Sequence, residues 1–495
     1  MEKYILAIDA GTTGITILLF DHNAKIVKRT YSEFNQVYPR PGWVEHDPTE
    51  IWSTTQKLLR EIVEHVDPKS IAGIGITNQR ETTVVWNRLT SAPIYNAIVW
   101  QCKRTSKKCE ELILNGYSDK FQSKTGLIID SYFSGTKINW ILNNITNAYD
   151  MAKSGDLAFG TIDTWIIWNL TNRKSHVTDH TNASRTLIYN IDDKNWDTEL
   201  LDILDIPIQM LPKIQNSSSN FGLTSKSIFG VEIPISGVAG DQQSALYGQL
   251  AFDSGMAKCT YGTGCFMLTN TGEGRINSRN GLLTTIACDA WGNPVYSIEG
   301  SVFIGGAVIQ WLRDELKLIN SAHETDQIAQ SVDSTNGVYI VPAFTGLGAP
   351  YWDMNSRGTI SGITRGTNSA HLVRASLESI AYQVYDLFTA VQLDMGSQSS
   401  ILQVDGGASQ NDFLMQFQAD ILNIEISRPD SIETTALGVA LLAGLSVKFW
   451  TSPDDFKSII KINELFVPSI SSRKRSSLLA GWEETIAKTL TRKNK

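Results

Sequence analysis

Residues 4–20 constrain the fold more than any other part of the chain. Tyr4 to Ile8 form a continuous apolar run, typical of a strand buried on both faces. The Gly/Thr turn Asp9-Ala-Gly-Thr-Thr-Gly14 follows, and residues 15–20 are again rich in β-branched, leucine and aromatic side chains, which predicts a second strand. P-loop and Rossmann phosphate sites need a strand, a glycine loop and then a helix, so the sequence indicates neither class.

The same arrangement, a strand followed by a Gly/Thr turn and another strand, occurs again in the second half of the chain. The segment Cys259-Thr-Tyr-Gly-Thr-Gly-Cys-Phe-Met-Leu268 repeats the organisation of residues 4–20, although few letters match. A chain of 495 residues also exceeds what one hydrophobic core holds. We therefore expect an α/β protein of two similar domains, residues 1–248 and 249–495, that face each other across a deep catalytic cleft.

The most informative carboxylate is Asp241. An apolar strand, Ile235-Ser-Gly-Val-Ala-Gly240, precedes it, and a helix is predicted to begin at it. An aspartate at a helix N-terminus is usually a cap, which is the structural alternative. The two Gly/Thr loops and the pair Gly406-Gly407 favour a phosphate site instead, with Asp241 at the carboxyl end of a strand, where α/β proteins bind ligands.

These parts suit the transfer of a phosphoryl group. Such a reaction needs positioning, a metal ion and dispersed positive potential, which the backbone N–H groups and hydroxyls of Gly/Thr turns help to provide. We predict that Thr12, Thr13 and Thr263 donate to phosphate oxygens. Asp9, at the end of the first strand, is expected to hold Mg²⁺ directly or through water, and Asp241 is expected to accept the proton of the attacking hydroxyl.

Arg80 and Glu81 allow two interpretations. They follow the apolar segment 71–77, so they are either ordinary hairpin charges or the donor and acceptor of a pocket for a polyol, whose hydroxyls both donate and accept. Trp100 and Tyr132 end apolar segments, and by frequency alone they are core residues.

Two further segments are interpreted structurally. Asp47, followed by a proline and then by Glu50, has the spacing of a helix cap with a capping box, so we prefer a structural role for Asp47 and His46. Residues 159–185 are expected to form strands and loops, with Asp163 at a turn.

The composition narrows the classes of partner. The net charge of −8 argues against nucleic acid or an anionic membrane as the main partner. The five cysteines form no C-x-x-C pair, which indicates reduced thiols rather than a disulfide framework. No apolar run approaches the roughly 18 residues of a spanning helix, and the start lacks the features of a signal peptide. A soluble, cytoplasmic protein without membrane insertion is expected.

Several longer motifs resemble those of glycerol kinases, members of the FGGY family of carbohydrate kinases. The resemblance runs from about residue 3 to residue 485. It rests on Asp9-x-Gly-Thr-Thr, Pro41-Gly-Trp-Val-Glu-His-Asp-Pro, Gly75-Ile-Thr-Asn-Gln-Arg-Glu-Thr, Tyr95-Asn-Ala-Ile-Val-Trp-Gln, Gly240-Asp-Gln-Gln, Thr260-Tyr-Gly-Thr-Gly-Cys-Phe-Met-Leu, Val341-Pro-Ala-Phe-Thr-Gly-Leu-Gly-Ala-Pro-Tyr-Trp and Val404-Asp-Gly-Gly-Ala. It implies two actin-like ATPase (ribonuclease H-like) domains with ATP and glycerol in the cleft between them, and a homodimer or homotetramer.

The resemblance also implies roles for individual residues. Those for the acceptor glycerol are Arg80, Glu81, Trp100, Tyr132, Asp241, Gln242 and Phe266, with Trp100 and Phe266 as apolar walls. Those for ATP are Thr12, Thr13, Gly14, Thr263, Gly306, Gln310, Gly407 and Asn411. Apart from the resemblance, we predict Asp9 and Asp241 as the residues for Mg²⁺.

The chain departs from the family pattern in two places. Glycerol kinases commonly carry Gln after the first Asp and Ser-Ser-Arg after the two threonines, where this chain has Ala10 and Gly14-Ile15-Thr16. We expect weaker ATP binding, or another basic group in place of the arginine. Residues 223–232 contain neither His nor Arg, so we predict that neither fructose 1,6-bisphosphate nor histidine phosphorylation controls this protein; inhibition by micromolar fructose 1,6-bisphosphate would refute the first half.

Three alternatives to a glycerol kinase remain at this stage. Another sugar kinase of the same family would show a more open acceptor pocket. A non-catalytic regulator would bind ATP without turnover, which the intact Asp9, Asp241 and threonine loops argue against. An actin-like assembling protein would have no need of an acceptor pocket.

Overall fold

The computed structural model describes residues 2–396, 399–431 and 433–491. The chain forms two compact units, each built from several stretches of sequence. The first unit comprises Met1–Phe252, Thr284–Tyr296 and Thr434–Ile459, and the second comprises Asp253–Leu283, Ser297–Glu433 and Ile460–Lys495.

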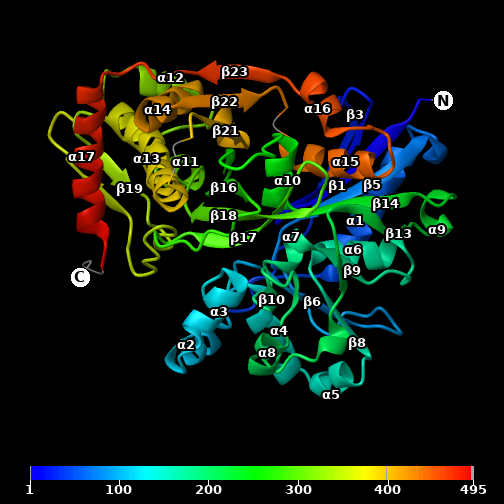
Figure 1. Cartoon of the computed structure of the whole chain (residues 1–495). Coiled ribbons are helices and arrows are strands. Elements are labelled where there is room, and N and C mark those ends of the chain that lie inside the picture. Colours follow the sequence, from blue (N-terminus) through cyan, green and yellow to red (C-terminus); the bar gives the residue numbers. More distant parts are fainter. Residues whose placement is uncertain (1, 397–398, 432, 492–495) are drawn as a thin grey trace. The chain divides into compact units, whose positions relative to one another are not determined.

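A mixed six-stranded sheet is the centre of the first unit, with strand order β13-β14-β5-β1-β2-β3 (Figure 1). The parallel strands β1, β5 and β14 lie next to one another, and β2, β3 and β13 pair antiparallel with their neighbours. The bounds are β1 Tyr4–Ala10, β2 Gly14–Phe20, β3 Ile26–Glu33, β5 Ile71–Asn78, β13 Ser218–Leu223 and β14 Pro234–Gly240.

The predicted first hairpin is confirmed. β1 and β2 pair antiparallel from Ile5↔Phe20 to Ala10↔Ile15, with the Gly/Thr turn between them. All seven residues of β2 are buried, as the apolar pattern requires of a strand covered on both faces.

Helix α15, Thr434–Ser446, packs closely on this sheet because glycines leave room for it. A Cβ atom on Gly75 of β5 would lie 2.3 Å from the carbonyl oxygen of Val439. Helix α10, Asp241–Gly248, makes a similar contact, since a Cβ atom on Gly438 would lie 1.9 Å from the carbonyl oxygen of Ser244. The apolar, Ala/Gly-rich sequence of α15 thus fixes the helix α10 that begins at Asp241.

The cap predicted at residue 47 is present. Asp47 precedes α1, Pro48–Val63, and its side chain accepts from the Thr49 N–H at 2.8 Å. Glu50 accepts from the backbone and side-chain nitrogens of Asn35, so the capping-box part of that prediction is not what the structure shows.

The strands and loops predicted for residues 159–185 are wrong in part. The segment contains α6, Ile162–Leu170, and α7, His180–Ala183, and Asp163 lies in the first turn of α6 instead of at a loop. The sequence of α6 is apolar on nearly every side and rich in isoleucine and tryptophan, so it has no helical stripe to recognise.

The first unit contains further helices and short strands. They are β4 Glu45–His46, η1 Pro68–Ser70, β6 Val84–Asn87, β7 Ala97–Ile98, α2 Ser106–Leu114, α3 Ser118–Thr125, α4 Ser134–Asn144, α5 Ala148–Lys153, β8 Leu157–Gly160, β9 Val177–Asp179, β10 Tyr189–Asn190, β11 Asn195–Trp196, α8 Thr198–Ile203, η2 Ile208–Met210, β12 Lys213–Gln215, α9 Lys226–Phe229 and α16 Pro453–Ile459.

The second unit repeats the plan of the first. Its sheet contains the strand order β18-β16-β15-β21-β22-β23, in which β15 pairs antiparallel with β16 and parallel with β21, as β1 does with β2 and β5. The strands after residue 252 are β15 Ala257–Tyr261, β16 Cys265–Gly272, β17 Leu283–Cys288, β18 Pro294–Val302, β19 Tyr339–Val341, β20 Thr359–Ser361, β21 Ile401–Asp405, β22 Glu425–Pro429 and β23 Ile462–Phe466. Nearly all of β17 and the start of β18 fall in the segment Thr284–Tyr296, which belongs to the first unit. The helices are α11 Ala307–Asp314, α12 Glu324–Gln330, α13 Ser369–Met395, η3 Gly407–Gln410, α14 Asp412–Leu422 and α17 Ser472–Thr489. The predicted repeat of strand, Gly/Thr turn and strand is therefore confirmed.

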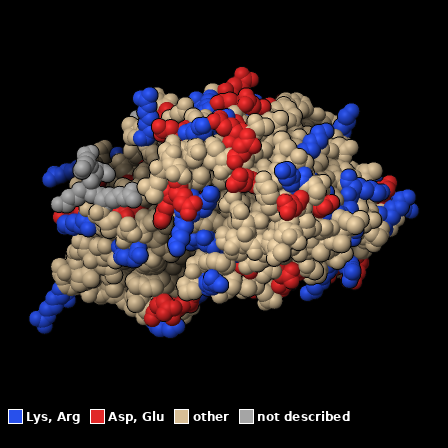
Figure 2. Space-filling model, turned by 90° about the horizontal axis from the view of Figure 1, so that it is seen from below, with Lys and Arg blue, Asp and Glu red and all other residues tan. Residues whose placement is uncertain are grey.

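The charged side chains on the face drawn in Figure 2 are mixed in sign. Lys and Arg alternate with Asp and Glu there, so neither sign dominates that face. Among residues 2–396, 399–431 and 433–491, no helix is both long and apolar enough to cross a membrane.

Gly438→Ala is expected to destabilise the protein although alanine is the better helix former. A methyl group would overlap the Ser244 carbonyl, and such overpacking costs about 1–3 kcal/mol. Urea unfolding of the variant measures this. The control is Gly366→Ala, whose Cβ would have no atom nearer than 3.6 Å. A Gly438→Ala protein as stable as the wild type would contradict the close packing.

Candidate active site

The carboxyl ends of three parallel strands meet at one edge of the first sheet. Ala10 of β1 and Gly240 of β14 both pair with Asn78, the last residue of β5 between them. Asp9 and Asp241 therefore approach the same edge from strands that are two apart. In open α/β sheets this edge is where ligands bind.

Asp241 is the first residue of α10 and not its cap. The N-cap is Gly240, and the carboxylate of Asp241 accepts from the N–H of its neighbour Gln242 at 2.7 Å. The same oxygen, Oδ1, lies 3.1 Å from Nε of Arg80, while the side chain is 31% exposed. Asp241 is thus oriented by a buried guanidinium and still accessible to a ligand, which argues against the capping alternative.

Arg80 and Glu81 form a buried pair at the end of β5. Their side chains are each 2% exposed, and Nε of Arg80 lies 3.8 Å from Oε1 of Glu81. The hairpin alternative is wrong, because β5 belongs to the six-stranded sheet whereas β6 pairs with β8 in another. Glu81 has a φ of +61°, a left-handed conformation that is uncommon for glutamate and is often found at functional sites.

Helix α4 holds the backbone of Glu81 by hydrogen bonds to its carbonyl oxygen. The carbonyl of Glu81 accepts from Ser134 Oγ at 3.0 Å and from the amine of Lys137 at 3.4 Å, and the amine also donates to the carbonyl of Tyr132. Burial lowers the pKa of Lys137 to about 7. Two residues predicted to contact the acceptor are therefore held by one buried amine.

Two of the predicted aromatic residues lie together and contact this network. The rings of Trp100 and Tyr132 are 5.5 Å apart in an edge arrangement, and the guanidinium of Arg185 lies 5.4 Å from the centre of the Tyr132 ring. The indole N–H of Trp100 donates to Thr12 Oγ1 at 3.0 Å. This contact links the predicted wall of the acceptor pocket to the first Gly/Thr turn.

Side chains from two other segments hold that turn. Gln79 donates to the carbonyl of Gly11, and Gln36 donates to the carbonyl of Thr12, both at 3.0 Å. His46 Nε2 lies 2.7 Å from Oε1 of Gln36, and burial lowers the pKa of His46 to about 4. A neutral histidine that orients a glutamine has a structural role, as expected for His46, although by this contact and not through a helix cap.

The first turn also explains one departure from the family pattern. A Cβ atom on Gly14 would lie 2.8 Å from the ring of Tyr31 and 2.7 Å from the carbonyl oxygen of Ser32, so the tyrosine leaves no room for a larger residue. Thr16 is nearly buried and pairs with Asp9 across the β1–β2 ladder.

The second unit contains a cavity of about 410 Å³ at the corresponding end of its sheet. Five residues predicted to bind the nucleotide line it, namely Thr263, Gly306, Gln310, Gly407 and Asn411. The other lining residues are Tyr261, Gly262, Ile309, Arg313, Ala322, His323, Thr325, Asp326, Leu377, Ala408 and Gln410. These five positions span about 150 residues of sequence, and the fold brings them to one cavity.

Each predicted residue therefore has a defined place. The first unit brings together Arg80, Glu81, Trp100, Tyr132, Asp241 and Gln242 near the turn that holds Thr12, Thr13 and Gly14. Phe266 lies on β16 of the second unit, so its role as a wall of the acceptor pocket stays a prediction. Sequence reasoning missed Lys137 and Arg185, whose contacts with Glu81 bridge 56 and 104 residues of sequence.

Comparison with known proteins assigns the family. The model of the N-terminal domain of the FGGY family of carbohydrate kinases matches residues 4–248, and that of the C-terminal domain matches residues 257–447. The chain belongs to this family. It is 55% identical to a glycerol kinase of Thermoanaerobacter sp. (strain X514) and 54% identical to one of Clostridium botulinum (strain 657 / Type Ba4), in both cases over 99% of each chain. Its place in the FGGY family is therefore among the glycerol kinases.

Solved structures agree with the fold. A crystal structure of Plasmodium falciparum glycerol kinase with ADP superimposes with a TM-score of 0.93 at 38% identity and covers 99% of both chains. Xylulose kinase and gluconate kinase of Lactobacillus acidophilus superimpose with TM-scores of 0.88 at 24% identity, which supports the shared fold alone. The expected α/β protein with two FGGY domains is confirmed.

The buried amine predicts a pH-dependent stability. Lysine in the unfolded chain titrates near 10.5, so between pH 7 and that value the unfolded chain binds one proton more at Lys137 than the folded chain does. The free energy of unfolding therefore gains a positive pH slope of at most about 1.4 kcal/mol per pH unit from this group. We expect the difference between wild type and Lys137→Met to rise from pH 7 to pH 10 in urea unfolding. Lys457→Met, which changes an exposed lysine, is the control. A difference between wild type and Lys137→Met that stays constant from pH 7 to pH 10 would contradict the burial of a neutral amine.

Proposed function

We propose that this chain transfers the γ-phosphate of ATP to a terminal hydroxyl of glycerol, giving sn-glycerol 3-phosphate and ADP. The observation that carries this proposal is the pairing of Asp241 with the buried Arg80, 3.1 Å apart, beside the equally buried Glu81. This arrangement offers a polyol a donor, an acceptor and a proton-accepting carboxylate within one small network. The glycerol kinases that match along the whole chain support the choice of acceptor.

The proposed roles follow from the chemistry of these groups. Arg80 donates to hydroxyl oxygens of glycerol, and Glu81 accepts from its hydroxyl protons. Asp241 accepts the proton of the attacking hydroxyl, and a weak base suffices when the transition state is loose. Trp100 and Tyr132 cover the C–H face of glycerol and exclude water, with Gln242 beside the base and Phe266 as a further wall.

The second-unit cavity is the proposed nucleotide site. Gly306, Gln310, Gly407 and Asn411 line it, and its volume suits part of a nucleotide. Thr263 of that cavity, with Thr12, Thr13 and Gly14 of the first turn, is proposed to donate to phosphate oxygens through hydroxyl and backbone N–H groups. The nucleotide must reach the acceptor hydroxyl beside Asp241 for transfer to occur.

Asp9 and Asp241 fit the needs of Mg²⁺. Carboxylate oxygens are the ligands that this ion prefers, and it usually retains several waters beside one or two carboxylates and substrate phosphates. Among the residues that the structure describes, no group of three His, Cys, Asp or Glu side chains could hold a metal by itself. Asp9 lies on β1 and Asp241 follows β14 directly, so the two carboxylates stand at the ends of the strands that flank β5, as this sparser coordination requires. When bound, the ion would neutralise charge on the phosphates.

The domain bounds, the oligomeric state and the location of the protein are proposals as well. We infer domains at residues 1–248 and 249–495, a homodimer or homotetramer, and a cytoplasmic location. The in-class alternative is a kinase of a larger polyol, and the acceptor panel described next distinguishes it.

The proposal is tested by ADP release from Mg-ATP with glycerol, xylulose, gluconate or no acceptor. We expect turnover with glycerol and sn-glycerol 3-phosphate as product. Asp241→Asn should lower kcat by about 10²–10⁴-fold, because proton acceptance by a positioned base contributes that much. Turnover only with a larger polyol would show that the acceptor is wrong, and ATP binding without any turnover would favour a regulator.

Thr16→Arg tests whether the missing arginine weakens ATP binding. Thr16 lies opposite Asp9 at the end of the first hairpin, so an arginine there would carry its charge close to the predicted phosphate site. A charge-assisted hydrogen bond contributes roughly 1.5–3 kcal/mol, which predicts about a tenfold or greater fall in the KM for ATP. The matched control is Thr16→Gln, which is long but uncharged. An unchanged KM for ATP in a folded Thr16→Arg protein would count against the idea.

A further inference from the structure

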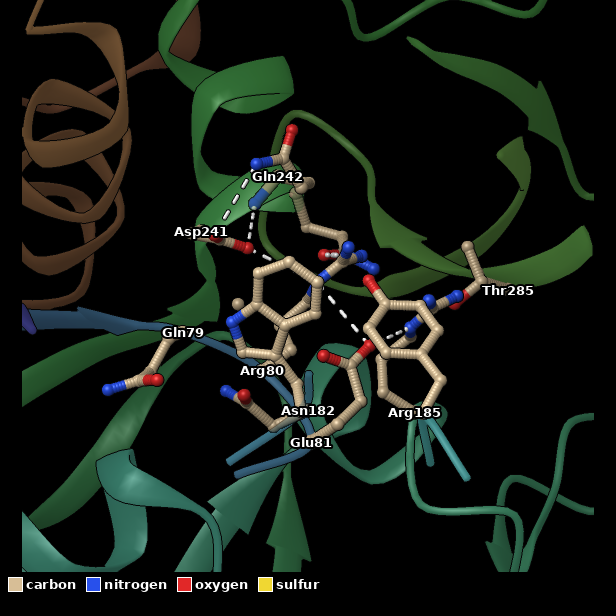
Figure 3. A network of polar contacts seen from close by, with 12 residues as sticks. Gln79, Arg80, Glu81, Asn182, Arg185, Asp241, Gln242 and Thr285 are labelled. Carbon is tan, nitrogen blue, oxygen red and sulfur yellow. Dashed lines mark hydrogen bonds and ion pairs between the residues drawn. The ribbon is translucent and has the colours of Figure 1, made fainter. Parts of the chain in front are cut away.

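Arg185 occupies a position behind the acceptor network that the family motifs do not explain. Its side chain is fully buried, and its Nε donates to Oε1 of Glu81 at 2.6 Å. The guanidinium lies 5.4 Å from the centre of the Tyr132 ring and 5.2 Å from that of Phe133. Figure 3 shows Arg185 and Arg80 on opposite sides of the Glu81 carboxylate.

The segment that carries Arg185 is anchored to the strand ends that form the site. Asp179 caps α7 by accepting from the N–H groups of Thr181 and Asn182. Thr181 Oγ1 accepts from the N–H of Gly240 at 2.8 Å, and Asn182 Oδ1 accepts from the side chain of Asn78 at 3.0 Å. The helix is thereby tied to the ends of β14 and β5, which sets where the following Arg185 enters the site.

Four charged groups of alternating sign follow one another through the network. Asp241 lies 3.1 Å from Arg80, Arg80 lies 3.8 Å from Glu81, and Glu81 lies 2.6 Å from Arg185. Arg80 therefore stands between two carboxylates. Because Arg185 contacts Glu81 at the shorter distance, Arg80 remains close to Asp241.

We propose that Arg185 is a positioning residue of the acceptor site, which keeps Glu81 ionised and in place and so reserves Arg80 for Asp241. This inference rests on the proposed function, because it assigns Glu81 the task of accepting from the hydroxyls of glycerol. Arg185 acts through Glu81 and Tyr132 and does not itself touch the acceptor.

Removal of Arg185 would leave two carboxylates around one guanidinium. Other groups near Glu81 include the Lys137 amine, 3.4 Å from the Glu81 carbonyl, and Tyr132, whose ring Arg185 faces. Buried carboxylates that share too little positive charge take up a proton more readily. A protonated Glu81 donates a hydrogen bond where it should accept one. In a protein that lacks Arg185, the binding of glycerol should therefore weaken as the pH falls.

Arg185→Met is expected to raise the KM for glycerol by at least about tenfold, the range of a lost charge-assisted contact, with the KM for ATP changed by less than about twofold. The acid limb of kcat/KM for glycerol should move to higher pH. Arg185→Lys, which keeps the charge, should retain most of the wild-type pH profile and so act as the conservative rescue.

The chain offers a closely matched control. Arg104 is likewise fully buried, its Nη2 lies 2.6 Å from Oε1 of Glu45, and its guanidinium lies 3.9 Å from the centre of the Trp43 ring. Arg104→Met breaks an equally buried ion pair among aromatic rings, but outside the acceptor network. It should lower stability while leaving the KM for glycerol and the pH profile unchanged.

A second variant covers the case in which Arg185→Met does not fold. Arg185→Met with Glu81→Gln removes both charges, so no lone carboxylate stays buried. We expect this pair to fold, to bind glycerol poorly, and to show no shift of the acid limb. An acid limb that lies at higher pH in the pair than in the wild type would overturn the proposal.

The same measurements separate this proposal from the assignment of the substrate. Kinetics of the variants are taken with the acceptor that the wild-type protein phosphorylates fastest, so absence of turnover with glycerol would refute the acceptor and not the role of Arg185. The role of Arg185 is contradicted if Arg185→Met keeps the wild-type KM for its acceptor and the wild-type pH profile, or if Arg104→Met shifts both equally.

Discussion

The candidate site depends on the placement of four charged side chains, three of which are buried. Arg80, Glu81 and Arg185 have side chains that are almost fully buried, and Asp241 alone is partly exposed. A buried charge is costly unless it is paired, so each group is fixed by the next. The exposed end of this series is the one that needs access to a ligand. Burial therefore provides orientation, while the one open carboxylate provides reactivity.

The elements of the fold that surround these charged side chains make their burial possible. The strands β1, β5 and β14 end at one edge, and α10 begins there with Asp241. Glycines on β5 and α15 let helices approach the sheet and each other at backbone distance, which leaves little freedom for the start of α10. The left-handed conformation of Glu81 is held by hydrogen bonds to its carbonyl from α4. Distant segments thus cooperate to hold a strained residue.

The sequence predicted the local elements better than the distant contacts. The hairpins β1–β2 and β15–β16 and the strand before Asp241 have clear patterns of apolar and glycine residues, and they are confirmed. Helix α6 was not predicted because its sequence is apolar on nearly every side and so lacks a helical pattern. Arg185 and Lys137 were not predicted because their partner Glu81 is 104 and 56 residues away in the sequence. A pattern within a short stretch of sequence cannot predict such a distant contact. The grouping of five predicted nucleotide residues around one cavity likewise became visible only in the fold.

A crystal structure with glycerol bound tests the account most directly. It predicts that a terminal hydroxyl of glycerol lies within about 2.6–3.2 Å of the Asp241 carboxylate, with the other hydroxyls on Arg80 and Glu81. It also predicts that Arg185 keeps its contact with Glu81 and makes none with glycerol. Glycerol bound elsewhere, or held at this site without a hydroxyl near Asp241, would contradict the account.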